Sequence, residues 1–231
     1  GTEARFSPYM SKSLARLVDV SLRMNDLSGL DEVFAKLSQV PPNQVDAGLQ
    51  YAKGKAYYFR KSYNDAKSSF AAVGRDTPYT HQSRYFEGLV AMREAVASHT
   101  GKGPANYKAA IEAFRKATEL PADTEEHRHV GDLSWMAIGR LFYEMEQFSQ
   151  AAEAYSKVGR DSLEFDTMLY ELAWVYVRLG DTQRAETQLE AAETALRAIV
   201  AMAPEGIPVR RHLERLADLR SAVERGEGDI P

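Results

Sequence analysis

The sequence contains no cysteine, and this absence removes disulfide bonds, thiolate metal ligands and thiol nucleophiles together. It also lacks a long apolar run, because stretches such as LYELAWVYV and ALRAIVAMA fall well short of the roughly 20 residues that a membrane-spanning helix needs. Neither sign of charge dominates, since 29 basic residues stand against 33 acidic ones. We therefore expect no direct membrane insertion and no polybasic surface for nucleic acid or anionic lipid.

Sequence motifs of common enzymes are missing as well. No GxSxG, HExxH or glycine-rich dinucleotide motif occurs. The GKG at 101–103 lacks the spacing of a phosphate loop. The two histidines of HRH at 127–129 would lie on different sides of a helix, and no third ligand is near them. We predict that the protein is not an enzyme, needs no cofactor and has no metal site.

Small residues recur along the chain at a fixed period, within segments that are rich in aromatic residues. They are Gly54, Gly88, Gly139 and Ala173, of which the first two are 34 residues apart, as are the last two. Downstream of the first three, an alanine is followed four residues later by an aromatic residue, in the pairs Ala66 and Phe70, Ala110 and Phe114, and Ala151 and Tyr155. Self-similarity with a period of about 20–50 residues is the signature of a repeat protein.

These segments resemble tetratricopeptide repeats (TPRs), whose pattern places small, large and aromatic residues at such spacings. The resemblance implies an all-α fold, a right-handed α-solenoid of antiparallel helix pairs that forms a TPR superhelix. A single domain over 1–231 would then hold repeats at 47–80, 81–124, 132–165 and 166–203. The second repeat carries an insertion, and the second helix of the fourth is predicted to continue to about Met202. Residues 119–132 are expected to be an irregular stretch, and Glu125 and Glu126 within it are interpreted as charge at a helix start, favoured by the helix dipole.

In this fold the recurring glycines are predicted to be packing residues. Where the two helices of a pair meet, only a small residue lets the backbones approach closely, and the aromatic residue fills the space beside it. The helix-propensity cost of a glycine, about 1 kcal/mol relative to alanine, is then outweighed by the contact between the helices. We predict that Gly139→Leu would overpack this contact and cost about 1–3 kcal/mol or more.

The two flanks are predicted to be helical. Residues 11–42 are typical of a degenerate N-terminal helix pair, because Val18, Leu30, Phe34, Leu37 and Pro42 follow the repeat pattern while its glycine and alanine are lost. Terminal repeats of a solenoid are expected to be atypical, since they cap the stack. Residues 208–226 carry an amphipathic leucine stripe. They are predicted either to cap the last repeat or to form a seam for a partner or a dimer.

The resemblance also implies a concave face, lined by the first helix of each repeat, that binds a partner. Carried over residue by residue, this face consists of Tyr51, Lys55, Tyr58, Phe59, Gln82, Tyr85, Leu89, Met92, Arg93, Met136, Arg140, Tyr143, Tyr170, Trp174 and Arg178. Tyrosines, a tryptophan and single cations suit contacts with protein segments. The residues of the chaperone-binding carboxylate clamp are absent. The face could instead be filled by the chain's own C-terminal helix.

We therefore expect a protein-interaction scaffold that binds a peptide or a partner helix on its concave face. The run from Arg160 to Asp181 is similar to repeats of bacterial cell-envelope and gliding-motility proteins, which favours a periplasmic or cell-envelope location over a cytoplasmic one. Two alternatives remain open: a self-associating spacer module that forms a homo-oligomer, and a regulatory TPR domain of a larger protein. The linker-like ends, GTEARFSP and GEGDIP, suggest a processed or excised segment.

Overall fold

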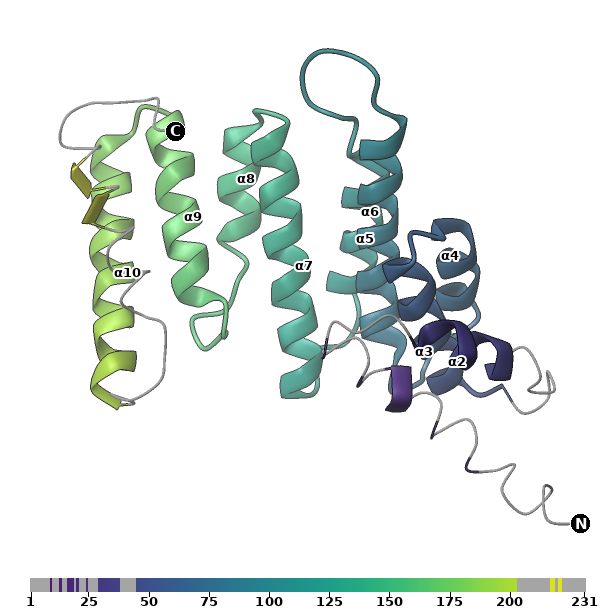
Figure 1. Cartoon of the computed structure of the whole chain (residues 1–231). Coiled ribbons are helices and arrows are strands. Elements are labelled where there is room, and N and C mark those ends of the chain that lie inside the picture. The colour runs from purple at the N-terminus through teal and green to yellow at the C-terminus, as the bar shows by residue number, and fades with distance from the viewer. Residues whose placement is uncertain are drawn as a thin grey trace, which may run out of the picture. The chain divides into compact units, whose positions relative to one another are not determined.

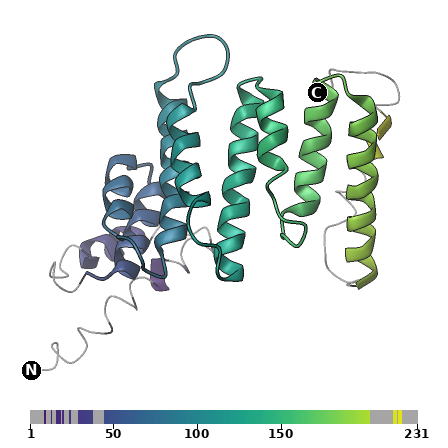
Figure 2. The ribbon, with the colours of Figure 1, turned by 180° about the vertical axis from the view of Figure 1, so that it is seen from behind.

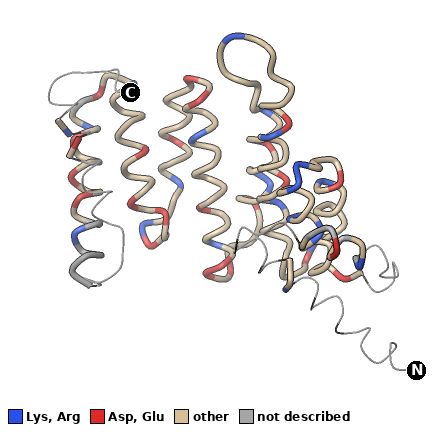
Figure 3. Tube along the Cα trace, in the orientation of Figure 1, with Lys and Arg blue, Asp and Glu red and all other residues tan. Residues whose placement is uncertain are grey.

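A computed structural model describes residues 9, 13, 16–18, 20, 24, 29–37, 45–202, 217, 218, 220 and 221. Each element labelled in Figure 1 is an α-helix, so the predicted all-α fold is confirmed. The chain divides between Leu120 and Pro121 into two compact units, each with its own helix pairs. Basic and acidic residues are interspersed along the helices of both units (Figure 3).

The first unit contains α2 (Leu30–Leu37), α3 (Ala47–Phe59), α4 (Tyr63–Ala71), α5 (Thr80–Ser98) and α6 (Lys108–Thr118). Helices α3 and α4 form one antiparallel pair, α5 and α6 form the next, and α4 packs against α5. The start of α3 is set by Asp46, whose carboxylate accepts a hydrogen bond of 2.8 Å from the Leu49 amide. The predicted insertion forms the loop between α5 and α6.

The second unit contains α7 (Glu125–Glu144), α8 (Phe148–Tyr155), α9 (Phe165–Arg178) and α10 (Thr182–Met202), again as two antiparallel pairs (Figure 2). The described part of α10 reaches Met202, so the predicted extension of this helix is present up to that residue. The prediction that 119–132 is irregular is wrong for its second half, because α7 begins at Glu125. Thr124 caps this helix by accepting a 3.1 Å hydrogen bond from the His127 amide, and Glu125 and Glu126 lie at the positive end of its dipole.

The turns inside three of the four pairs share one geometry. Each holds a residue in the left-handed conformation, Lys61 (φ 62°), Glu146 (φ 57°) or Gly180 (φ 73°). The amide that follows it bonds back to a carbonyl five residues earlier, as Gln147 does with Phe142 at 2.8 Å. This is the pattern of a Schellman motif, which satisfies carbonyls at the end of the first helix. Equivalent hydrogen bonds in different helix pairs show that the repeats found in the sequence are also repeats of the backbone structure.

The three predicted packing glycines lie against the aromatic ring of the second helix of their own pair. A Cβ atom built on Gly54 would lie 2.6 Å from Phe70 Cδ1, and one on Gly88 would lie 2.7 Å from Phe114 Cγ. On Gly139 it would lie 2.7 Å from Tyr155 Cε1. Real Cβ atoms almost never approach other atoms below 3.0 Å. The space that a side chain would need is therefore taken by the ring, and the packing role is confirmed.

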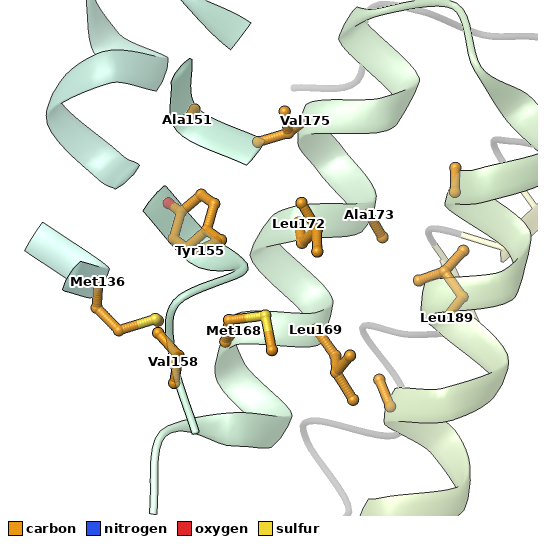
Figure 4. Close-up of a cluster of buried hydrophobic side chains, with 12 residues drawn as sticks. Met136, Ala151, Tyr155, Val158, Met168, Leu169, Leu172, Ala173, Val175 and Leu189 are labelled. Atoms are coloured by element: carbon orange, nitrogen blue, oxygen red, sulfur yellow. The ribbon is translucent and has the colours of Figure 1, made fainter. Parts of the chain in front are cut away.

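The fourth pair makes the same helix contact with a larger residue on its first helix and a smaller one on its second. Ala173 is fully buried, and the residue that faces it from α10 is Leu189 (Figure 4). An aliphatic side chain thus stands where the other pairs have a ring, and an extra methyl group stands where they have a glycine. The exchange keeps the total volume of the contact similar, which close-packed interiors require.

Only parts of the predicted flanks fall within the described residues. Val18 and Val33 are buried, and α2 lies inside the predicted N-terminal helix pair. Of the predicted helix at 208–226, residues 217, 218, 220 and 221 are described, and they are helical; the others lie outside the described residues. Arg220 forms ion pairs of 3.1 Å with Glu193 and 3.5 Å with Glu190. Both partners belong to α10, the second helix of the last pair.

Candidate functional site

The second unit contains an open pocket of about 540 Å³ between α7, α8 and α9. Helices α7 and α9 supply most of its lining through residues three or four apart, which share one face of a helix. The lining residues are Arg140, Tyr143, Glu144, Tyr155, Tyr170, Glu171 and Trp174. We call this site the α7–α9 pocket.

A hydrogen-bond network, partly exposed to solvent, fixes one side of the α7–α9 pocket. Arg140 donates two hydrogen bonds to the Glu171 carboxylate, from Nε to Oε2 over 2.9 Å and from Nη2 to Oε1 over 2.6 Å. The Tyr155 hydroxyl donates to Glu171 Oε2 over 2.8 Å. Bidentate guanidinium–carboxylate pairs combine strength with a defined orientation. The network therefore joins α7, α8 and α9, and it holds three polar groups in place at the edge of the pocket.

The network also determines the protonation of its members. The pKa of the Tyr155 hydroxyl is raised well above its usual value by burial, and further by the neighbouring Glu171 carboxylate. The pKa of Arg140 is raised by its hydrogen bonds to Glu171, and the negative charges of Glu171 and Glu164 add to the effect. Tyr155 thus stays a hydrogen-bond donor and Arg140 stays a cation across the physiological range.

The α7–α9 pocket brings together four residues of the predicted concave face: Arg140, Tyr143, Tyr170 and Trp174. Sequence reasoning missed three further lining residues, Glu144, Tyr155 and Glu171. Tyr155 had been assigned to the core, and its ring does lie there, with a side chain that is 2% exposed. The signal that could have found it is the hydroxyl group, since Phe70 and Phe114 occupy the equivalent places in other repeats.

Two other predicted face residues of this unit lie elsewhere. Met136 is 0% exposed and belongs to the hydrophobic cluster with Val158 and Met168, so it is a core residue and offers no surface to a partner (Figure 4). Arg178 places its guanidinium 4.9 Å from the centre of the Phe148 ring on α8. A cation over an aromatic face is attracted by the ring electrons.

In the first unit the predicted face is largely a network of aromatic residues that joins its two complete repeats. Tyr51 and Tyr58 both pack edge-on against Phe86, with ring centres 5.9 and 5.6 Å apart. Tyr85 lies 5.5 Å from Phe114. The remaining predicted residues are Lys55, Phe59, Gln82, Leu89, Met92 and Arg93. All of them are at least partly exposed, and Phe59 is 44% exposed.

Two cations rest on this aromatic network. Arg93 Nε donates to the Tyr58 hydroxyl over 3.3 Å, and Lys55 Nζ lies 5.1 Å from the centre of the Tyr51 ring. The Arg93–Tyr58 contact joins neighbouring repeats of one unit, whereas Lys55 and Tyr51 lie one turn apart on α3. Both contacts hold the tyrosines in position while leaving part of each side chain at the surface.

The described part of the chain has no group of three or more acidic or histidine residues that could hold a metal ion. His127, one of the two histidines of HRH, has its Nδ1 at 2.5 Å from the Asp123 carboxylate. No described helix is both long enough and apolar enough to cross a membrane.

Comparisons with known proteins agree with the repeat architecture. A sequence model of the family described as "Soluble NSF attachment protein, SNAP" matches residues 32–229. None of the curated proteins matches the chain. A solved structure of MamA, from residue 41 to its end, from Desulfovibrio magneticus RS-1 is 17% identical, with a TM-score of 0.57 over 82% of this chain and 96% of that one.

A second solved structure is the C-terminal part of a TPR repeat-containing protein from Cytophaga hutchinsonii. It is 18% identical, with a TM-score of 0.57 over 90% of this chain and 79% of that one. At such identities the likeness concerns the fold. It confirms the predicted resemblance to tetratricopeptide repeats.

Proposed function

The chain belongs to the soluble NSF attachment protein (SNAP) family, and from this premise we propose that it is a protein-interaction scaffold whose α7–α9 pocket holds a segment of a partner protein. The family is named for attachment to another protein, and repeat folds of stacked helix pairs commonly present extended binding surfaces.

The observation that carries the proposal is the composition of the α7–α9 pocket. Its volume of about 540 Å³ falls in the range of ligand sites, about 300–1,000 Å³. Three of its walls are aromatic side chains, Tyr143, Tyr170 and Trp174, which are enriched at the centres of protein interfaces. The Arg140–Glu171 pair supplies fixed polar groups beside them. Such a pocket suits an anchor side chain of a partner.

Affinity purification from the native organism, followed by cross-linking, identifies the partner and locates its contacts. Quantitative capture is then compared for the Tyr85→Ala/Trp174→Ala double variant and for each single variant. We expect the double variant to lose at least about tenfold in affinity, because truncating an interface hot spot costs about 2 kcal/mol or more. Helicity, followed by circular dichroism, should not change.

The control is Leu163→Ala, in the connection between α8 and α9, where the side chain is 78% exposed and does not line the pocket. It removes apolar surface of the same unit without touching the proposed site, so capture should match the wild type. Capture by the double variant at the wild-type level would disprove the proposed site. A concentration-dependent dimer in light scattering, with no other protein captured, would overturn the proposal in favour of self-association.

We further propose that the scaffold works in a bacterial cell-envelope or motility assembly. The support is the similarity of the run from Arg160 to Asp181 to repeats of such proteins. Fractionation of cells that express the full-length natural protein tests this location. Recovery in the periplasmic or membrane fraction is expected, and recovery in the cytoplasmic fraction alone would contradict it.

A further inference from the structure

We infer that the anchor taken by the α7–α9 pocket is a cationic side chain, lysine or arginine, of the partner segment. This inference rests on the proposed function, since it names the chemistry of the group that the same pocket binds. Three features support it: the charges of the lining residues, the aromatic walls, and the pairing of Arg140, the single cation of the lining, with Glu171.

The lining carries an excess of negative charge. It contains two carboxylates, Glu144 and Glu171, and one cation, Arg140. Arg140 and Glu171 bind each other through two nitrogens and both carboxylate oxygens, so they largely neutralise each other. The Glu144 side chain is exposed, and its carboxylate forms no ion pair or hydrogen bond with the described residues. A cation entering the pocket would therefore meet a carboxylate that has no protein partner of its own.

The aromatic walls favour the same kind of group. Faces of tyrosine and tryptophan rings attract cations, tryptophan most strongly, and Tyr143, Tyr170 and Trp174 lie together in this lining. The chain makes this contact elsewhere in the same unit, because the Arg184 guanidinium lies 5.8 Å from the centre of the Tyr176 ring. Lysine and arginine also carry apolar stems, which can pack along the aromatic walls while the charged group reaches the acidic edge.

An anionic anchor does not suit the site. It would need Arg140, whose Nε and Nη2 are both engaged by Glu171 over 2.9 and 2.6 Å. Releasing the guanidinium would leave Glu171 with only the Tyr155 hydroxyl as a described partner. The incoming anion would then face two carboxylates in the pocket, and like charges at short range repel.

The test uses the two tryptophans of the chain as reporters. Trp174 lines the pocket, whereas Trp135 packs on the hydrophobic cluster and is not part of the lining. Their two indole N–H signals, assigned with Trp174→Phe, are followed by NMR while single-residue probes are added. The probes are the Nα-acetyl N-methylamides of arginine, norleucine and glutamate, which share a backbone and differ in charge.

We expect the arginine probe to shift the Trp174 signal saturably, with a millimolar dissociation constant, and to leave Trp135 unmoved. Norleucine and glutamate probes should shift Trp174 much less. Glu144→Gln should weaken the arginine probe about two- to fivefold, the range of exposed ion pairs. Its control, Glu186→Gln on the exposed part of α10, makes the same change of net charge and should have no effect.

Equal shifts by the norleucine probe, larger shifts by the glutamate probe, or unchanged arginine binding in Glu144→Gln would overturn the inference. These outcomes are separate from a failure of the proposed function. If Trp174→Ala loses partner capture but the arginine probe leaves Trp174 unmoved, the scaffold stands and its cationic anchor is refuted. If the Tyr85→Ala/Trp174→Ala variant captures the partner like the wild type, the proposed site itself fails.

Discussion

Two glycines of α7 offer a direct test of the packing argument, because the same substitution should have different effects on stability at the two positions. A Cβ atom on Gly139 would lie 2.7 Å from Tyr155 Cε1 and 2.8 Å from its Cζ, whereas one on Gly131 would meet nothing within 4 Å. Both residues lie in the interior of the helix Glu125–Glu144. Gly131→Ala is therefore a matched control for Gly139→Ala.

The magnitude follows from two terms. Replacing a glycine inside a helix by alanine raises helix propensity by about 1 kcal/mol, and both variants gain this. At Gly139 the added methyl group overpacks the contact, which costs about 1–3 kcal/mol. The Tyr155 ring cannot move aside freely, since it is 2% exposed and its hydroxyl is bonded to Glu171. The propensity term cancels in the comparison, so the difference between the two variants, about 1–3 kcal/mol, measures the packing term alone.

Urea unfolding followed by tryptophan fluorescence measures this difference. Both tryptophans, Trp135 and Trp174, belong to the second unit, so the signal reports on the unit that contains the substitutions. We expect Gly131→Ala to stabilise the unit and Gly139→Ala to destabilise it or leave it no more stable than the wild type. In Gly139→Leu the loss should be larger. If the two alanine variants unfold with free energies that agree within about 0.5 kcal/mol, the spread expected between independent sites, the glycine is not a packing residue.

Two further predictions concern the same contacts. The double variant Gly88→Ala/Phe114→Leu recreates the Ala–Leu pair of the last repeat. It should therefore be less destabilised, by about 1–2 kcal/mol, than the sum of the losses in the two single variants. The measurement is urea unfolding followed by circular dichroism, and additive losses would contradict the exchange of volume. Tyr155→Phe keeps the ring but removes the hydrogen bond to Glu171, and it should cost about 1.5–3 kcal/mol at neutral pH. Because the pKa of Tyr155 is raised in the folded state, the wild type loses stability once the unfolded tyrosine ionises, above about pH 10. The difference in free energy of unfolding between the wild type and Tyr155→Phe should therefore shrink as the pH rises from 10 to 11.5. A difference that stays constant over that range would refute a buried Tyr155 hydroxyl bonded to Glu171.

Most of the fold could be predicted because its determinants are local. The two helices of a pair are joined by a short turn, so a glycine and its aromatic partner lie 16 residues apart in both Gly54–Phe70 and Gly139–Tyr155. At that distance, side-chain size alone decides whether the two helices can approach each other. The same combination of a small and a large residue recurs with the 34-residue period along the chain. Two of the left-handed turn residues, Glu146 and Gly180, are likewise 34 residues apart.

For the start of α7 the repeat boundary was wrong, whereas the interpretation of Glu125 and Glu126 as charge at a helix start is confirmed. The pattern of the repeats placed the first helix of the third pair at residue 132, yet Thr124 provides a capping hydroxyl and Glu125 and Glu126 follow it. These three residues stabilise a helix end wherever it occurs. Gly131 has no effect on the boundary, since one glycine costs only about 1 kcal/mol in a helix of this length.

By itself, the sequence determined the helix pairs, their order and the glycines at their crossings, because residues close along the chain decide all three. Only the tertiary structure decided the α7–α9 pocket. Arg140 and Glu171 are 31 residues apart, and they meet because of their side-chain conformations and the packing of α7 against its neighbours. Neither the conformations nor the packing produces a periodic pattern in the sequence. The same packing turned Met136 into the core and brought the Tyr155 hydroxyl to the edge of the pocket, since the rotation of a helix about its axis depends on everything that it touches.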